Sequence, residues 1–96
     1  MSAPACTHLD QVLVTDIPTR DRVEGCEECL RTGMHWLHLR VCLTCGRIGC
    51  CDDSPGRHAS QHARADAHPL IRSIEPGEEW VWCFVDETAF VLRSDG

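Results

Sequence analysis

The strongest constraint on this chain is a stretch between residues 26 and 68 that gathers eight side chains able to bind metals. Five are cysteines and three are histidines, and they run in the order Cys26, Cys29, Cys42, Cys45, Cys50, His58, His62 and His68. Structural zinc is held by four such ligands in a tetrahedron, and a Cys-x2-Cys pair supplies two of them because both sulfurs can face one ion. Eight ligands therefore predict two closed zinc sites, which are typical of structural rather than catalytic metal.

A disulfide framework is the alternative use of eight cysteines in 96 residues. Two features favour metal. The cysteine pairs are accompanied by histidines, which a disulfide scaffold does not need, and residues 1–5 have neither the basic start nor the apolar run of a secretory signal. We therefore expect a cytoplasmic protein with reduced thiols, in which zinc binding supplies much of the folding free energy.

The charge of the chain limits its partners. A formal net charge of -6 disfavours nucleic acid and anionic membrane surfaces, because neutralisation of phosphate drives such binding. No segment approaches the ~20 apolar residues of a membrane span. We expect a monomer whose partner, where it has one, is a protein or peptide tail. Residues 1–96 are expected to form one domain with a core over residues 6–92.

The apolar pattern predicts a small zinc-stabilised α+β domain with a twisted antiparallel sheet of four to five strands and one main helix. Leu37, Leu39 and Val41 alternate with polar residues, which indicates a half-buried strand within residues 34–42. Further strands are expected over residues 11–14, 47–50, 70–74, 80–84 and 89–92.

The main helix is expected over residues 56–67. Ser54 can cap it and Pro55 suits the first helical position. His58 and His62 are four residues apart and share one helix face, from which they could reach one ion or two. Spacing alone thus leaves open whether the ligands pair sequentially, with the two Cys-x2-Cys pairs on one ion, or in an interleaved scheme.

The order of these motifs resembles the ubiquitin-protease-type (UBP-type) zinc finger. The order is Cys-x2-Cys, Trp36 seven residues later, Cys-x2-Cys-x4-Cys, His-x3-His and His68-Pro-Leu. Residues 49–58 and 75–87 resemble the short stand-alone bacterial members. The resemblance implies the interleaved scheme, with one zinc on Cys26, Cys29, Cys50 and His58, and the other on Cys42, Cys45, His62 and His68.

Some members of the family hold a third zinc, which implies a further candidate site here. Cys6 and His8 match its N-terminal half, whereas Cys83 is followed by Asp86 where those members have a second cysteine. A carboxylate can also bind zinc. We therefore expect two zinc ions and leave a third open; the alternative is that Cys6 and Cys83 are ordinary thiols.

The resemblance also implies a peptide-binding pocket. In ubiquitin-binding relatives, aromatic residues at the positions of Trp36, Trp82 and Phe84 line a pocket for a free C-terminal tail. Asp52 stands where those relatives hold the carboxylate with an arginine, and it would repel that carboxylate. The alternative for the tryptophans is packing in the core.

These observations favour a non-catalytic zinc module that recognises a protein tail or peptide, with binding of a ubiquitin tail disfavoured by Asp52. The sequence lacks an HExxH-like helix, which would have indicated a metal-dependent enzyme. There are two alternatives. One is a thiol or zinc redox sensor, in which Cys51 beside a ligand would need a lowered pKa. The other is a purely structural zinc domain.

Overall fold

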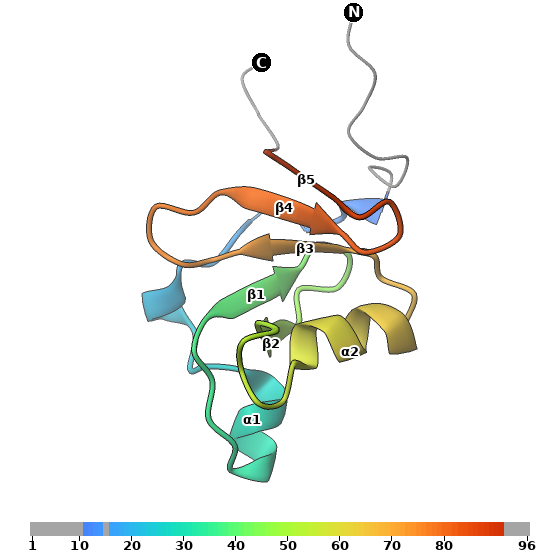
Figure 1. Ribbon diagram of the computed structural model, residues 1–96. Coiled ribbons are helices and arrows are strands. Elements are labelled where there is room, and N and C mark those ends of the chain that lie inside the picture. The colour runs from blue at the N-terminus through green and yellow to red at the C-terminus, as the bar shows by residue number, and fades with distance from the viewer. Residues whose placement is uncertain (1–10, 15, 92–96) are drawn as a thin grey trace, which may run out of the picture.

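Five strands form one antiparallel sheet in the computed structural model of the protein, which describes residues 11–14 and 16–91 (Figure 1). The strands are β1 (Leu39–Cys42), β2 (Ile48–Cys50), β3 (Leu70–Ser73), β4 (Trp80–Cys83) and β5 (Thr88–Val91). Their order across the sheet is β2-β1-β3-β4-β5, and every neighbouring pair is antiparallel. The predicted α+β sheet of four to five strands is confirmed.

One main helix, α2 (His58–Ala65), packs against β1 and β2, as predicted. A short helix, α1 (Glu27–Thr32), lies beside β2, and a 3-10 turn, η2 (Arg20–Arg22), precedes it. In Figure 1 both α-helices lie at the β2 end of the sheet, while β4 and β5 extend away from them. Within the part of the chain that the structure describes, no helix is long and apolar enough to cross a membrane.

One face of the sheet carries the hydrophobic core. Strand residues alternate between the two faces, so every second side chain of β1, β3 and β4 points to this side. Described residues that precede α1 pack over the same face. The core includes Leu39, Val41, Leu70 and Val81, all fully buried, and Val12, Ile17 and Val23 of the N-terminal segment pack against it.

The opposite face of the sheet is only partly covered. The register places Arg40, Ile71 and Trp82 on this side. Helix α2 covers the β2 end, where Gly49 lets the helix approach closely: a Cβ on Gly49 would lie 2.7 Å from the backbone nitrogen of Ala59. The β4–β5 end, which carries the tryptophans, extends beyond the helix.

In the first half of the chain one expected strand is absent and another starts later than expected. Residues 11–14 are not a strand; the N–H groups of Leu13 and Val14 both donate to the carbonyl of Leu43, each at 2.9 Å, without forming a ladder. The strand expected within residues 34–42 begins only at Leu39, and Leu37 is 54% exposed. A period-2 pattern shows alternation but not where pairing starts, and Leu37 lies before the point where β2 and β3 supply partners.

The expected start of the main helix is also wrong. Ser54 and Pro55 precede the helix without capping it, and α2 follows Arg57, which adopts a left-handed conformation with φ of 48° and makes no side-chain cap. Ser54 is buried, and its hydroxyl instead accepts a hydrogen bond of 2.8 Å from the backbone N–H of Leu37. It therefore fixes the loop before β1 rather than the helix.

Candidate metal centres and aromatic trough

The first group of metal-binding side chains, the Cys3His cluster, is formed by Cys26, Cys29, Cys50 and His58. Cys26 caps the N-terminus of α1, and its sulfur accepts a hydrogen bond of 3.4 Å from the backbone N–H of Cys29. Cys50 ends β2 and His58 begins α2. Three fully buried sulfurs and one imidazole thus join a helix start, a strand end and a second helix start.

The second group, the Cys2His2 cluster, is formed by Cys42, Cys45, His62 and His68. Cys42 ends β1 and Cys45 lies in the turn that follows it. His62 lies in the middle of α2, one turn after the histidine of the other cluster, and His68 follows the helix. The two clusters therefore hold α2 at two successive turns, in the interleaved scheme that the family resemblance implies.

The spacing of the donor atoms fits tetrahedral zinc. With bonds of about 2.3 Å to sulfur and about 2.0 Å to nitrogen, a tetrahedron separates two sulfurs by about 3.8 Å and a sulfur from a nitrogen by about 3.5 Å. The sulfurs of Cys29 and Cys50 are 3.8 Å apart, and each lies 3.3 to 3.5 Å from Nδ1 of His58. The Cys3His cluster is therefore already shaped for the ion.

The same test holds for the Cys2His2 cluster. Cys42 Sγ lies 3.5 Å from His68 Nδ1, and Cys45 Sγ lies 3.2 Å from His62 Nε2. The two imidazole nitrogens are 3.3 Å apart, as two nitrogens on one tetrahedral zinc require. Each cluster supplies four ligands, so each is closed, and the chemistry that zinc supplies there is cross-linking of the chain.

The electrostatics of both clusters call for a cation. Burial, together with the neighbouring thiols of Cys26 and Cys50, raises the pKa of the Cys29 thiol to about 12. Burial also raises the pKa of Cys42, and it lowers the pKa of His62 so that the imidazole is neutral, as a ligand must be. A divalent cation among these sulfurs offsets the burial penalty and ionises the thiols.

A carboxylate supports the less buried cluster. Asp66 lies one turn after His62 on α2, and its Oδ2 is 3.1 Å from the Nδ1 of that histidine. The other ring nitrogen, Nε2, faces Cys45. A carboxylate on the far nitrogen fixes the orientation of a metal-binding imidazole and raises its basicity. The spacing His62-x3-Asp66 in the sequence places the two side chains one helical turn apart, so it could have indicated this contact.

The candidate third site extends outside the described residues, because Cys6 and His8 lie there. In its other half, Cys83 ends β4 and Asp86 lies in the turn that follows. The backbone N–H of Asp86 donates to Cys83 Sγ at 3.4 Å, which is the same i to i+3 contact that joins Cys29 to Cys26. The two alternatives for these residues, a third zinc site or ordinary thiols, are therefore not decided by the described residues.

A hollow of about 600 Å³ lies on the partly covered face of the sheet, between β4 and the start of α2. We call it the aromatic trough. Its lining includes Arg40, Asp52, Asp53, Trp80, Trp82 and Phe84. A second hollow of about 650 Å³, here the adjoining hollow, continues along α2 toward residue 67 and shares Asp52, Trp82 and Phe84 with the trough. Three of the four predicted peptide-binding residues therefore meet at one place.

The fourth predicted residue, Trp36, lies elsewhere. It is half-buried and packs against the hydrophobic core. Its ring also lies over Gly25, where a Cβ would come within 2.3 Å of the indole. Gly25 has φ of 142°, so two features of the backbone there require glycine. Trp36 therefore packs against the core, which was the alternative for the tryptophans, while Trp82 lines the trough.

Arg40 is a trough residue that sequence reasoning missed. Its guanidinium carbon lies 4.5 Å from the centre of the Trp80 ring. Its Nη1 donates to the carbonyl of Leu39 at 3.0 Å and to the hydroxyl of Ser73 at 3.4 Å, and lies 4.0 Å from a carboxylate oxygen of Glu78. Strand alternation could have placed Arg40 on this face, but its tryptophan partner comes from a strand 40 residues later, two strands across the sheet.

Cys51 lies beside the Cys3His cluster without belonging to it, and it also lines the trough. The thiol is 6% exposed, and its Sγ lies 3.4 Å from the Ser54 hydroxyl and 3.9 Å from Nδ1 of His38. Burial opposes ionisation, but the hydrogen bond with Ser54 and those with backbone groups outweigh it, so the pKa of Cys51 lies below its ordinary value.

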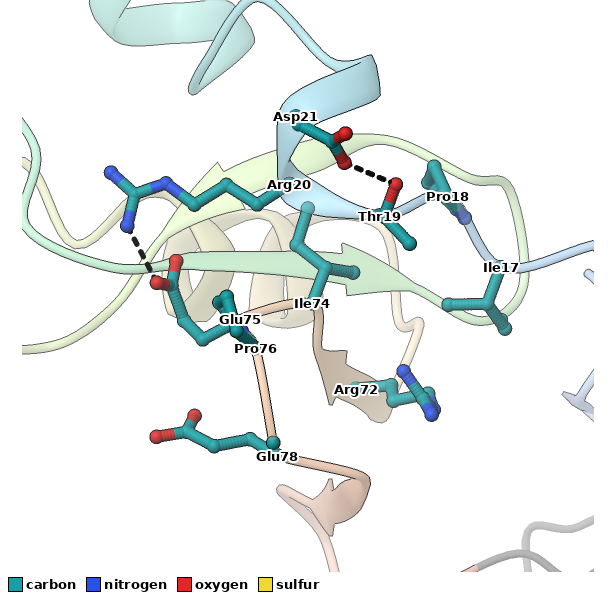
Figure 2. Close-up of a pocket in the computed structure, with 11 residues that line it drawn as sticks. Ile17, Pro18, Thr19, Arg20, Asp21, Arg72, Ile74, Glu75, Pro76 and Glu78 are labelled. Atoms are coloured by element: carbon teal, nitrogen blue, oxygen red, sulfur yellow. Dashed lines mark hydrogen bonds and ion pairs between the residues drawn. The ribbon is translucent and has the colours of Figure 1, made fainter.

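A third hollow, the N-terminal groove, has a volume of about 700 Å³ and lies between residues 17–21 and residues 72–78 (Figure 2). Its walls include Ile17 and Ile74, which also belong to or pack on the core. Nη1 of Arg20 lies 2.5 Å from Oε1 of Glu75 and closes one side of it. The other oxygen of this buried carboxylate accepts a hydrogen bond of 2.8 Å from the N–H of Leu39.

Comparison with known proteins identifies a family model and a similar solved structure. The model of the family described as the zinc finger in ubiquitin-hydrolases and other protein matches residues 26–95. The solution NMR structure of protein RPA1320 from Rhodopseudomonas palustris is 43% identical and superposes with a TM-score of 0.69, over 95% of this chain and 93% of that chain. No curated protein matches the chain.

Proposed function

The chain belongs to the family of zinc fingers found in ubiquitin hydrolases and other proteins, and we propose that it is a non-catalytic binding module that receives a protein tail or peptide in the aromatic trough. In this proposal the two zinc ions organise the fold and the trough makes the contact. The four-ligand clusters support a non-catalytic role, because a catalytic zinc keeps one position for water or substrate.

The observation that carries the proposal is the placement of the aromatic side chains. The chain has three tryptophans, two phenylalanines and no tyrosine. Three of these five, Trp80, Trp82 and Phe84, line the trough and are only half-buried. A domain this small gains most stability by burying its largest apolar side chains, so keeping three of them on one hollowed face supports a binding role.

The rigidity of the walls also favours binding. Strand β4 carries Trp80 and Trp82 and is paired on both sides. Helix α2, which forms the opposite wall, is held by His58 in one cluster and His62 in the other. A site on elements that are fixed in this way loses little conformational entropy when a ligand binds.

The test is a titration of the zinc-loaded, 15N-labelled protein with short C-terminal peptides, some ending in Gly-Gly, followed by two-dimensional NMR. We expect shifts of the trough residues and of the indole N–H of Trp82. Trp82→Ala should weaken binding at least about tenfold, as central aromatic contacts commonly do. The matched control is Leu30→Ala, which truncates an exposed side chain on α1 that is 48% exposed and should leave the affinity unchanged.

A titration in which no peptide shifts the trough signals at millimolar concentration contradicts the proposal. So does equal binding by the wild-type protein and Trp82→Ala, provided that the variant retains two zinc ions and a dispersed amide spectrum.

A further inference from the structure

Resting on the proposed function, we infer that the trough selects its peptide through a cationic side chain, arginine or lysine, and not through a terminal carboxylate. The site of this selection is the junction of the aromatic trough and the adjoining hollow. Trp82, Phe84 and Asp52 are the residues that line both hollows, so a side chain entering from either one meets all three.

The junction has the form of an aromatic corner. The rings of Trp82 and Phe84 are nearly perpendicular, with an interplanar angle of 87° and centroids 6.4 Å apart. Such an arrangement offers one ring face and one ring edge to a ligand. The face of an indole attracts a cation through its quadrupole, more strongly than other aromatic rings do. An aliphatic stem of lysine or arginine also packs well in such a corner.

The charges around the corner favour a cation. Asp52 is exposed, and the hydroxyl of Ser60 donates to its Oδ1, which orients the carboxylate from the first turn of α2. Asp53 follows it in the trough lining. Among the residues that the structure describes, neither aspartate lies within ion-pair distance of an arginine. The described residues that line the adjoining hollow include one arginine, Arg64, together with the carboxylates of Asp52 and Glu87.

The same strand already binds one guanidinium. Arg40 lies over the Trp80 ring at 4.5 Å, and Glu78 supplies a carboxylate at 4.0 Å. Trp82 lies two residues further along β4 and therefore points to the same face. An arginine of a peptide over Trp82, with Asp52 in the place that Glu78 takes for Arg40, repeats an arrangement that the fold already contains.

A terminal carboxylate finds little to hold it in the trough. Among the described residues that line it, the one cation is Arg40, whose side chain is only 11% exposed. That guanidinium donates to the Leu39 carbonyl and the Ser73 hydroxyl, and it stacks on Trp80. The carboxylates of Asp52 and Asp53 also line the trough. They repel the carboxylate of a peptide that enters it.

The experiment compares four peptides on the zinc-loaded full chain by NMR titration. Three are acetylated and amidated alanine–serine heptapeptides with arginine, lysine or glutamine at the centre. The fourth is the acetylated glutamine peptide with a free C-terminal Gly-Gly. We expect the arginine and lysine peptides to shift the Trp82 indole and to bind at least about fivefold more tightly than the glutamine and Gly-Gly peptides, as a cation–π contact combined with a charge pair allows.

Two charge variants sharpen the test. Asp52→Asn combined with Asp53→Asn keeps the acceptor for Ser60 and should weaken binding of the arginine peptide at least about fivefold. Glu24→Gln is the matched control, because it removes an exposed carboxylate of the N-terminal segment and should leave the affinity within about twofold. Zinc content and amide dispersion check that each variant is folded.

The outcomes separate this inference from the proposed function. Binding of the Gly-Gly peptide in the trough, with no preference for arginine, overturns the inference and leaves the proposed function standing. An arginine peptide that binds wild type and the double aspartate variant equally well also overturns it. If none of these or other tail peptides shifts the trough, both fail together.

Discussion

The aromatic trough and the N-terminal groove are hollows of similar size, about 600 and about 700 Å³, on opposite sides of the sheet. They differ in whether their lining side chains already have partners within the fold. In the groove, Ile17 and Ile74 contribute to core packing, and the charges of Arg20 and Glu75 neutralise each other. In the trough, Trp82 and Asp52 belong, among the residues that the structure describes, to neither the core cluster nor an ion pair. Cavity volume therefore identifies neither as a binding site, whereas the chemistry of the lining distinguishes them.

We interpret the groove as a seam between two segments of the fold. Glu75 is 8% exposed and joins the N-terminal segment, through Arg20, to β1, through the N–H of Leu39. A buried carboxylate with two such partners holds segments together. The two walls of the trough are held separately, α2 by one histidine in each metal cluster and β4 by pairing with β3 and β5.

The largest expected effect is the loss of both hollows when zinc is removed. Structural zinc contributes about 10 kcal/mol or more of folding free energy, which is comparable to the whole stability of a small domain. Chelation, or Cys29→Ala, should therefore collapse the dispersion of amide signals. Cys51→Ala is the control: its thiol lies outside both clusters, so the variant should keep two zinc ions. A native spectrum that persists in the metal-free protein contradicts this expectation.

The next effect separates the two hollows by stability. Glu75→Ala leaves the buried N–H of Leu39 without its acceptor and removes the ion pair with Arg20. We expect a loss of about 2 kcal/mol in the free energy of unfolding, measured by urea denaturation of the zinc-loaded protein. Peptide affinity should not change. Glu79→Gln, at an exposed position of the same loop, is the control, and a loss of peptide binding in Glu75→Ala would show that the groove takes part.

A smaller effect should reach the trough alone. Asp66→Asn removes the carboxylate behind His62 and should weaken zinc at the Cys2His2 cluster about tenfold. Because that cluster holds α2, which forms one wall of the trough, the amide signals of α2 should broaden while those of residues 17–21 stay sharp. Competition with a chromophoric chelator measures the affinity, and Asp16→Asn, at an exposed site, is the control. Equal broadening on both sides of the sheet would contradict the distinction.

The smallest effect concerns the wall of the trough. Arg40→Gln removes the guanidinium from Trp80 and should lower the free energy of unfolding by about 1 kcal/mol or less, since a partly exposed cation–π contact contributes about that much. Tryptophan fluorescence during urea unfolding measures the free energy of unfolding. Arg31→Gln, at an exposed position of α1, is the control. A loss of several kcal/mol would place Arg40 in the core instead.

The eight metal ligands and most strands could be predicted because their signals are local, whereas the division of the ligands between two clusters came from the family resemblance. Ligand spacing restricts how a chain can surround an ion, and β3 and β4 are short apolar runs on either side of a turn that contains Pro76 and Gly77. The limits of β1 could not be read in this way, since Leu37 belongs to the alternation but lies beyond the strands that would pair with it.

The neighbours of three residues, Trp36, Ser54 and Arg40, could not be predicted from the sequence. Trp36 packs where Gly25 leaves room, and Ser54 accepts from Leu37 instead of capping the helix that follows it. Arg40 meets Trp80 only once the order of strands is known. Tertiary contacts determine the neighbours of all three residues, so these neighbours cannot be read from a local sequence pattern.

The most direct test of this account is a set of intermolecular NOEs between the zinc-loaded protein and the arginine-centred heptapeptide. The account predicts NOEs from the arginine methylene groups to the rings of Trp82 and Phe84, and none to the methyl groups of Ile17 or Ile74. NOEs to Ile17 and Ile74, without any to Trp82, would place the peptide in the N-terminal groove and contradict it.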